Sequence, residues 1–226
     1  MKEDEAKALA AKAALEELPQ SGIIGLGSGS TARLFIAEVG ALVRAGRSFQ
    51  GVPTSEGSRK DAERGGIPLL DDNGPWDIAV TVDGADEVDA RLNLIKGGGA
   101  AHTREKIVNQ ASQRNVIIVD ESKLSERLGE KWPIPIEVLL FGHLATARLL
   151  SEVGRAVRRM KDGKPVMTDT GNALYDVHAG PLADPAATDR TLRDIPGVVE
   201  TGIFVGRADL VIVAGTSGIR KLRPSV

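Results

Sequence analysis

Short runs of consecutive apolar residues alternate along the chain with segments of helical periodicity. The apolar runs are GIIGLG near residue 22, FQGVP near 49, DIAVTV at 77–82, NVIIVD at 115–120 and DLVIVAG at 209–215. Continuous apolar runs are typical of parallel strands that are buried on both faces. Three intervening segments predict helices, at 31–45, 56–65 and 101–113. This alternation predicts an α/β fold with a doubly wound, mostly parallel sheet.

The pattern changes after GEKWPIPIE, where two prolines mark a boundary. The next segments predict strand, helix, two hairpin strands, helix and strand, in IPIEVLLF, HLATARLLSEV, RAVRRM with NALYDVHA, DPAATDRTLRDI and VVETGIFV. This order matches a split βαβ, ferredoxin-like α+β domain. The last apolar run has the character of the first domain's strands, so we predict that the chain returns there. The expected domains are residues 1–130 with 206–226, and an inserted domain at 131–205.

The N-terminal segment MKEDEAKALAAKAALEELP predicts an amphipathic helix with acidic residues in its first turn, ended by Pro19. It lacks the uninterrupted apolar stretch of a signal peptide, and no later stretch reaches membrane-spanning length. We therefore expect a soluble, cytoplasmic protein with no membrane partner.

Composition narrows the function classes. A net charge of −2 argues against a surface built for nucleic acid or anionic membrane, and an aromatic content of 3% leaves little material for base stacking. The chain has no cysteine, which excludes disulfides, thiolate metal sites and a cysteine nucleophile. Its histidines, His102, His143 and His178, lack paired ligand spacing. We expect no nucleic-acid partner, no metal and no cofactor.

The segment GLGSGSTA, residues 25–32, follows a predicted strand and precedes a predicted helix. A turn there can present backbone N–H groups to a phosphate at the helix N-terminus, with hydroxyl groups as further donors. A dinucleotide fingerprint would need glycine at Ser30, and a Walker loop would need a lysine that the segment lacks. A plain turn, with Ser30 or Thr31 capping the helix, is the structural alternative.

The segment DGADEVDARLNLIKGGGAAHTREK, residues 83–106, concentrates acidic residues, a lysine and three glycines. Asp83 and Asp86 follow the carboxyl end of a predicted strand, where open α/β sheets bind ligands. Taken alone, an acidic turn is also typical of a solvated loop or a helix cap.

Lys96 is followed by the glycines at 97–99 and then by Glu105 in the next predicted helix. Three glycines cost backbone entropy and leave no side chain to pack, which favours a place where backbone approaches a ligand closely. A structural Glu105 would be a surface carboxylate favoured by the helix dipole.

Together, GLGSGSTA, DGADEVD, NLIKGGGAAHTREKIV, DESK and TDTGNALYDV resemble the A-type ribose-5-phosphate isomerases of the pentose phosphate pathway. The resemblance covers most of the chain, in order. Ser28 stands where this family usually has threonine, His102 where an apolar residue is more usual, and EGSRKDAERGG departs from the family's usual segment.

The resemblance implies that Glu105 is the catalytic base and that Asp83, Asp86 and Lys96 lie at the reacting end. It implies a substrate-binding set of Ser28, Gly29, Ser30, Thr31, Gly84, Ala85, Gly97, Gly98, Gly99 and Lys123. The first expected domain would then be the phosphosugar-binding catalytic one. A small-molecule phosphosugar substrate and a homodimer or homotetramer are also implied.

Such an enzyme would interconvert ribose 5-phosphate and ribulose 5-phosphate by removing a proton next to a carbonyl, stabilising an enediolate and returning the proton to the neighbouring carbon. Two alternatives belong to other classes. A phosphosugar sensor would bind without turnover, and a DNA-binding one would need a helix-turn-helix for which the N-terminal helix leaves no room. A CoA-transferase-like acyl enzyme would use a glutamate as nucleophile.

Overall fold

The first structural unit is built on a six-stranded sheet with the strand order β15-β14-β6-β3-β1-β2. The computed structural model describes residues 2–224. The strands are β1 (Gly22–Leu26), β2 (Phe49–Pro53), β3 (Ile78–Asp83), β6 (Asn115–Asp120), β14 (Leu210–Gly215) and β15 (Gly218–Leu222). All neighbours pair in parallel except β15, which is antiparallel to β14 at the edge. The predicted mostly parallel sheet is confirmed, including the return of the C-terminal run beside β6.

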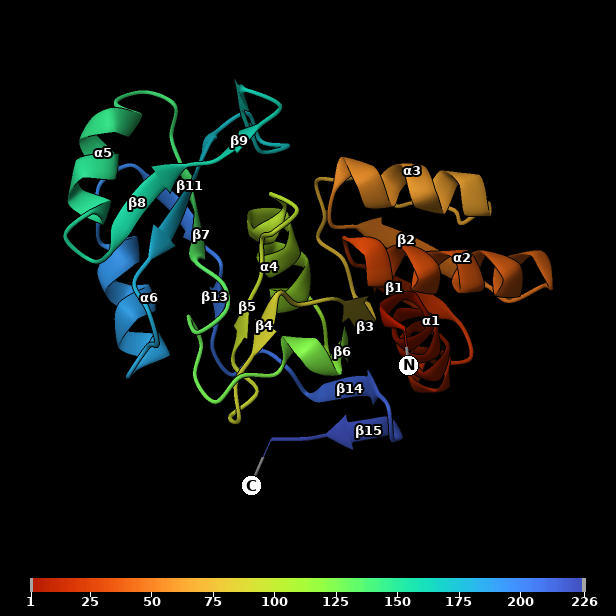
Figure 1. Ribbon diagram of the computed structural model, residues 1–226. Coiled ribbons are helices and arrows are strands. Elements are labelled where there is room, and N and C mark those ends of the chain that lie inside the picture. The colour runs from red at the N-terminus through yellow and green to blue at the C-terminus, as the bar shows by residue number, and fades with distance from the viewer. Residues whose placement is uncertain (1, 225–226) are drawn as a thin grey trace. The chain divides into compact units, whose positions relative to one another are not determined.

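Helices cover both faces of this sheet. They are α1 (Glu3–Ala13), the 3-10 helix η1 (Ala14–Glu17), α2 (Ser30–Arg44), α3 (Glu56–Gly65) and α4 (His102–Gln110). Buried residues of α1 and α2 share one core with alternate residues of the strands, and α1 and α2 lie together in Figure 1. Val108 of α4 packs in a separate cluster with Val52 and Ile78. Apolar residues on both faces of the strands are therefore buried, as a doubly wound fold requires.

The second unit carries a four-stranded antiparallel sheet with the order β12-β7-β11-β8. Its elements are β7 (Ile134–Val138), α5 (His143–Leu150), β8 (Arg155–Arg158), β11 (Ala173–His178), α6 (Pro185–Arg193) and β12 (Val198–Thr201). In chain order these are the strands and helices of the predicted ferredoxin-like unit, which is confirmed. Alternate strand residues pack with α5 and α6 in one core, on the side where Figure 1 shows both helices.

The other face of this sheet carries the residues that alternate with that core. Ile134, Ile136 and Val138 of β7 belong to the core, so Pro135 and Glu137 point the opposite way. By the same alternation, Asp176 of β11 lies on that opposite face. This second face of the sheet is polar, and Glu137 on it is nevertheless buried.

Three details depart from the predicted elements. VVETGIFV is not one strand: Gly202 separates β12 from β13 (Ile203–Phe204), which joins β5 (Leu94–Ile95) and β4 (Glu87–Val88) in a further small sheet. The segment between β8 and β11 contains its own short hairpin, β9 (Met160–Lys161) and β10 (Lys164–Pro165). Helix α4 ends before the predicted residue 113, because Gln113 donates its N–H to the Ile78 carbonyl.

Unit 1 comprises residues up to Ala85, Arg104–Lys123 and Arg207 onward, and unit 2 comprises Asp86–Thr103 and Leu124–Gly206. The expected boundaries had assigned 86–103 and 124–130 to the first domain. The difference has a physical reason, since β4 and β5 pair with β13 and Val88 pairs with Leu124. None of the helices between residues 2 and 224 combines the length and apolar character needed to cross a membrane.

Candidate active site

Three predicted site segments lie where neighbouring parallel strands of the first unit end. The loop at 28–31 follows β1, Asp83 ends β3, and the 3-10 helix η2 (Glu121–Lys123) follows β6. The chain order reverses between β1 and β3, because β2 lies beyond β1 and β6 lies beyond β3. Such a switch point is where open α/β sheets bind their ligands.

Asp83 is buried against the loop that follows β1. Its Oδ1 accepts hydrogen bonds from the backbone N–H of Ser28 at 2.9 Å and of Gly84 at 2.7 Å. A Cβ atom on Gly27 would lie 2.3 Å from that oxygen, so only glycine leaves room for the carboxylate. These charge-assisted bonds hold the start of the 28–31 loop in place.

The N-terminus of α2 has no side-chain cap. Gly29 is its N-cap residue, with φ +95°, and Ser30 and Thr31 are the first helical residues, so neither caps the helix as the structural alternative required. The Ser28 hydroxyl donates to Ser55 Oγ at 2.7 Å. The first N–H groups of a helix lack intrahelical partners, which suits this loop to an anion.

Asp86 holds the glycine run within the second unit. Its Oδ2 accepts the N–H of Gly98 at 2.6 Å, and a Cβ atom on Gly98 would lie 2.5 Å from its Oδ1. Gly97 has φ +105°, and a Cβ atom there would lie 2.7 Å from the His102 ring. At Gly99 no protein atom lies within 4 Å of the Cβ position. Two of the three glycines are therefore required by contacts inside the protein, and of the three only Gly99 faces open space.

Lys96 is almost completely buried, with 3% of its surface exposed. Its Nζ lies 5.6 Å from the centroid of the Phe204 ring, whose face attracts the ammonium charge. Its backbone N–H donates to the Gly202 carbonyl at 2.9 Å. The bend at Gly202, which sequence patterns did not predict, thus fixes the point from which the lysine side chain extends.

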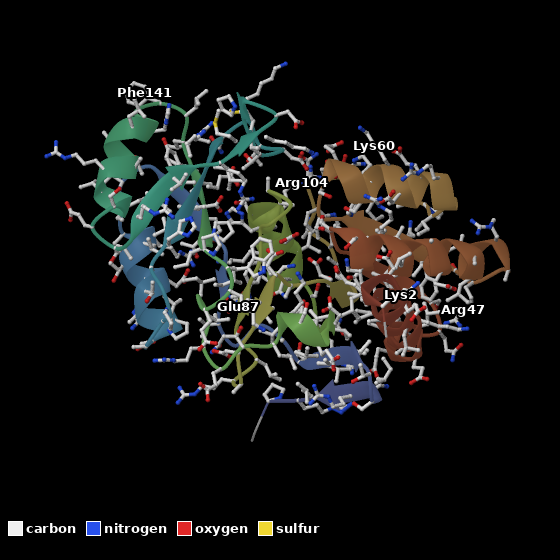
Figure 2. All side chains as sticks on the ribbon, viewed as in Figure 1. Lys2, Arg47, Lys60, Glu87, Arg104 and Phe141 are labelled. Carbon is white, nitrogen blue, oxygen red and sulfur yellow. The ribbon has the colours of Figure 1, made fainter. Side chains whose placement is uncertain are left out.

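Glu105 lies in the first turn of α4 and is 4% exposed. This burial contradicts the surface role that the structural alternative gave it. The adjacent Arg104, labelled on α4 in Figure 2, donates through Nη1 to Glu56 Oε1 at 2.9 Å and lies 3.6 Å from Asp72. These contacts within the first unit hold the turn that carries Glu105.

The remaining predicted residues lie in two short segments of the first unit. Gly84 and Ala85 are half-buried directly after β3, and Lys123 is half-buried at the end of η2. Asp120 accepts the N–H of Ser122 at 2.9 Å, which shapes the turn before Lys123. Ser28, Asp83 and Gly84 are joined by hydrogen bonds in unit 1, and Asp86 and Gly98 in unit 2.

Two further carboxylates of the acidic run have structural roles in the second unit. Glu87, labelled in Figure 2, is fully buried and accepts the N–H groups of Gly129 at 2.8 Å and Lys131 at 3.0 Å. Asp89 Oδ1 accepts the N–H of Asn93 at 2.8 Å. The run is therefore acidic partly because its carboxylates satisfy backbone donors of neighbouring loops.

Glu137 is a buried carboxylate that sequence reasoning missed, on the polar face of β7. It accepts hydrogen bonds from the hydroxyls of Thr103 and Thr170, from Thr168 Oγ1 at 2.9 Å and from Asn172 Nδ2 at 2.8 Å. Burial would raise the pKa of Glu137, but these hydrogen bonds outweigh burial and hold its pKa below the ordinary value of 4.5. Thr103 lies in the first turn of α4, the turn that also carries Glu105.

Comparison with known proteins places this arrangement in a family. A model of the family described as ribose 5-phosphate isomerase A (phosphoriboisomerase A) matches residues 50–218. The chain belongs to the ribose 5-phosphate isomerase A family. The ribose-5-phosphate isomerase A of Rhodopseudomonas palustris (strain BisB5) is 48% identical over 230 residues, covering 97% of this chain and 98% of that protein.

Solved structures of ribose-5-phosphate isomerases have the same fold over the whole chain. A D-ribose-5-phosphate isomerase in complex with phospho-erythronic acid has a TM-score of 0.95 at 41% identity, covering 99% of this chain and 100% of that one. The enzyme from Plasmodium falciparum has a TM-score of 0.94 at 33% identity, with coverage of 99% and 100%. As a member of the ribose 5-phosphate isomerase A family, this chain is an isomerase of the pentose phosphate pathway. A purely sensing role and an acyl-transferase role receive no support.

Some residues that shape the expected site could have been identified from the sequence pattern, and others could not. Glu137 is an acidic residue inside the apolar run IPIEV, and a charge at a position expected to be buried could have identified it. Arg159 has no such signal, because it follows another arginine at the end of a strand. Its partners become evident only when β8, β11 and the glycine run are assembled.

Proposed function

We propose that this chain interconverts D-ribose 5-phosphate and D-ribulose 5-phosphate through an enediolate, with Glu105 as the base. The observation that carries the proposal is the burial of Glu105, at 4% exposure, in the helical turn that follows the KGGG run. Buried ionisable side chains are commonly found in active sites, where their surroundings adjust them to proton transfer. Membership in the family supports ribose 5-phosphate as the proposed substrate.

The reaction needs one proton acceptor that serves two neighbouring carbons. In the open-chain aldose phosphate, Glu105 removes the proton from C2, and the electron pair of that bond moves toward the C1 carbonyl to form the enediolate. The same carboxyl group then returns a proton to C1, which leaves the carbonyl at C2 of the ketose phosphate. The hydroxyl proton at O2 is lost and one is gained at O1, so atoms and charge balance.

Lys96 and the backbone N–H groups of the glycine run would stabilise the enediolate charge. The Lys96 ammonium is preorganised because its backbone is bonded to Gly202 and its Nζ lies over Phe204. Preorganised donors contribute most where charge develops during the reaction. Asp83 and Asp86 would together handle hydroxyl protons during ring opening and along C1 to C3.

Substrate binding would use the anion-suited N-terminus of α2 for the phosphate. The proposed contacts are those of Ser28, Gly29, Ser30, Thr31, Gly84, Ala85, Gly97, Gly98, Gly99 and Lys123. Support comes from the N-cap of α2, which makes no side-chain capping bond, and from the open space in front of Gly99. The expected domain roles, with residues 1–130 and 206–226 catalytic and 131–205 inserted, remain a prediction, as does the cytoplasmic location.

We also propose that the chain forms a homodimer or homotetramer. Large apolar side chains are exposed around the start of α5, where Phe141 is 95% and Leu144 is 73% exposed, and Leu139 and Leu140 about half. Figure 2 shows Phe141 at the outer end of α5. Exposed apolar side chains gathered in one segment commonly mark protein interaction sites. A second copy of the chain is the simplest partner for this segment, because the proposed function requires no other protein.

The direct test is conversion of ribose 5-phosphate by the purified chain, followed by NMR in deuterated water. We expect ribulose 5-phosphate to form, deuterium to enter at C1, and the rate to survive treatment with a chelator, because proton transfer alone suffices. An inactive folded protein would contradict the proposal. A covalent adduct on the protein, detected by mass spectrometry after incubation with substrate, would favour the acyl-enzyme alternative.

A further inference from the structure

Two carbonyls of the glycine run in the second unit accept from one guanidinium group, and the Gly97 carbonyl also accepts the Ala100 N–H at 2.9 Å. Arg159 Nη1 donates to the Gly97 carbonyl at 2.7 Å and to the Gly98 carbonyl at 3.1 Å. The other side of the same guanidinium is engaged by Asp176, which accepts from Nε at 2.8 Å and from Nη2. One arginine thus joins a carboxylate of the ferredoxin-like sheet to two consecutive carbonyls.

We propose that Arg159 is a positioning residue for the isomerisation, which sets the direction of the backbone N–H groups in the glycine run. The inference rests on the proposed function, because that function gives those N–H groups a task. A peptide group is planar and trans, so its N–H points opposite to its carbonyl. Fixing the carbonyls of Gly97 and Gly98 therefore fixes the N–H groups of Gly98 and Gly99.

The first of these N–H groups, that of Gly98, is hydrogen-bonded to a proposed catalytic carboxylate. The Gly98 N–H donates to Asp86 Oδ2 at 2.6 Å, in the same peptide group whose carbonyl accepts from Arg159. Hydrogen bonds that share a peptide group polarise one another, so the arginine charge strengthens the donor that Asp86 accepts. Arg159 thus acts on Asp86 through one peptide group.

The second N–H group belongs to Gly99, where no protein atom outside the neighbouring residues lies within 4 Å of the Cβ position. Its peptide group is turned by the bond from Arg159 to the Gly98 carbonyl. A donor held in this direction suits an oxygen that carries developing negative charge. The positive charge of Arg159 at the carbonyl end also polarises this peptide group. The Gly99 N–H is therefore a stronger donor to such an oxygen.

The position of Arg159 is itself rigid. Its backbone N–H donates to the Leu174 carbonyl at 2.9 Å, and its carbonyl accepts from Val166 at 3.0 Å. The side chains of Arg159 and Asp176 are 15% and 17% exposed, so the pair is largely shielded from water. An ion pair with Asp176 alone would leave Nη1 unused, whereas here Nη1 binds both carbonyls.

Arg159→Met removes the donors and keeps an unbranched side chain, and Arg158→Met is the matched control. Arg158 lies over the Tyr175 ring and donates to the Val166 carbonyl at 3.4 Å, away from the glycine run. For Arg159→Met we expect kcat to fall about 10–100-fold, since misplacement by about 1 Å can cost that much, while KM changes less than about threefold. The control should retain both constants.

Binding measurements separate positioning from a general loss of structure. Phospho-erythronic acid carries a carboxylate whose two oxygens share a negative charge, as the oxygens of an enediolate do. In calorimetry, Arg159→Met should weaken binding of this acid at least about tenfold more than binding of ribose 5-phosphate. An equal loss for both ligands, or an unchanged kcat, would overturn the inference.

A second variant and the binding ratio test the inference even if Arg159→Met does not fold or the wild type is inactive. If Arg159→Met does not fold, Arg159→Lys retains a positive charge but lacks the planar fork, and the same selective loss is expected. If the wild-type chain does not isomerise ribose 5-phosphate, the proposed function fails, but the ratio of the two binding losses still decides whether Arg159 orients the N–H groups.

Discussion

Asp83 accepts the backbone N–H of Ser28 at 2.9 Å and so ties the end of β3 to the loop after β1. This bond joins two segments that are 55 residues apart in the chain, at the point where the strand order reverses. The contact depends on Gly27, because any Cβ atom there would displace the Asp83 carboxylate. Both proposed tasks, phosphate binding and proton handling, depend on it.

Gly27→Ala should therefore damage activity more than a helical glycine substitution does. We expect a loss of about 1–3 kcal/mol in the free energy of unfolding, from overpacking, together with a fall in kcat/KM. Gly57→Ala is the control, because its nearest atom, Ser55 Oγ, would lie at an ordinary 3.5 Å. Urea denaturation and the isomerase assay measure both effects. Normal activity in Gly27→Ala would show that the position of Asp83 does not matter.

Glu105→Gln should abolish turnover while binding survives. Glutamine keeps the shape of the side chain but cannot accept the substrate proton, and loss of a positioned general base costs about 10²–10⁴-fold in kcat. Glu38→Gln, on the exposed face of α2, is the control. If Glu105→Gln folds, binds ribose 5-phosphate in calorimetry and isomerises it at the wild-type rate, Glu105 is not the base.

Thr31→Ala and Lys123→Ala should chiefly weaken substrate binding. A charge-assisted hydrogen bond to phosphate is worth about 1.5–3 kcal/mol, which corresponds to roughly 10–150-fold in Kd. The measurement is calorimetry with ribose 5-phosphate, alongside kcat at saturating substrate. The phosphate site would have to be placed elsewhere if both variants bound normally.

Glu137 should make stability depend on acid pH. Its hydrogen bonds lower its pKa below the ordinary value of 4.5, so the folded state favours the carboxylate. The resulting stability is fully present above the unfolded pKa and is lost as pH falls through the lower folded pKa. In urea titrations, Glu137→Gln should be less stable than wild type at pH 7, and the gap should narrow below about pH 4.5. A gap that stays constant with pH would count against this role.

Phe141→Asp should weaken self-association without unfolding the chain. Its ring is 95% exposed, so the substitution removes no internal packing but places a charge within the apolar segment. We expect light scattering to show a dimer or tetramer for the wild type and a smaller species for the variant. Lys60→Asp, on α3, is a charge-changing control. A wild type that is monomeric at micromolar concentration would contradict the oligomer proposal.

The sequence alone was sufficient for the two main sheets, but not for the small sheet of β4, β5 and β13. Continuous apolar runs predicted the buried parallel strands, since such strands must be apolar on both faces, and the order of strands and helices after residue 133 predicted the ferredoxin-like sheet. Local signals failed where long-range contacts decide. The bend at Gly202 exists because β13 pairs with β5, which lies more than 100 residues earlier in the chain.

For the candidate site, the resemblance to the family implied which residues carry chemistry, which stays a prediction, and the sequence did not indicate what holds them. The three glycines at 97–99 stood out because they leave no side chain to pack, whereas the positions of Asp83, Lys96 and Glu105 alone left structural roles open. The tertiary structure alone decided that Asp86 lies against Gly98, that Glu87 satisfies loop donors and that Arg159 binds the Gly97 carbonyl. Hydrogen bonds of this kind join segments distant in the chain, and their partners follow from packing rather than from local sequence pattern.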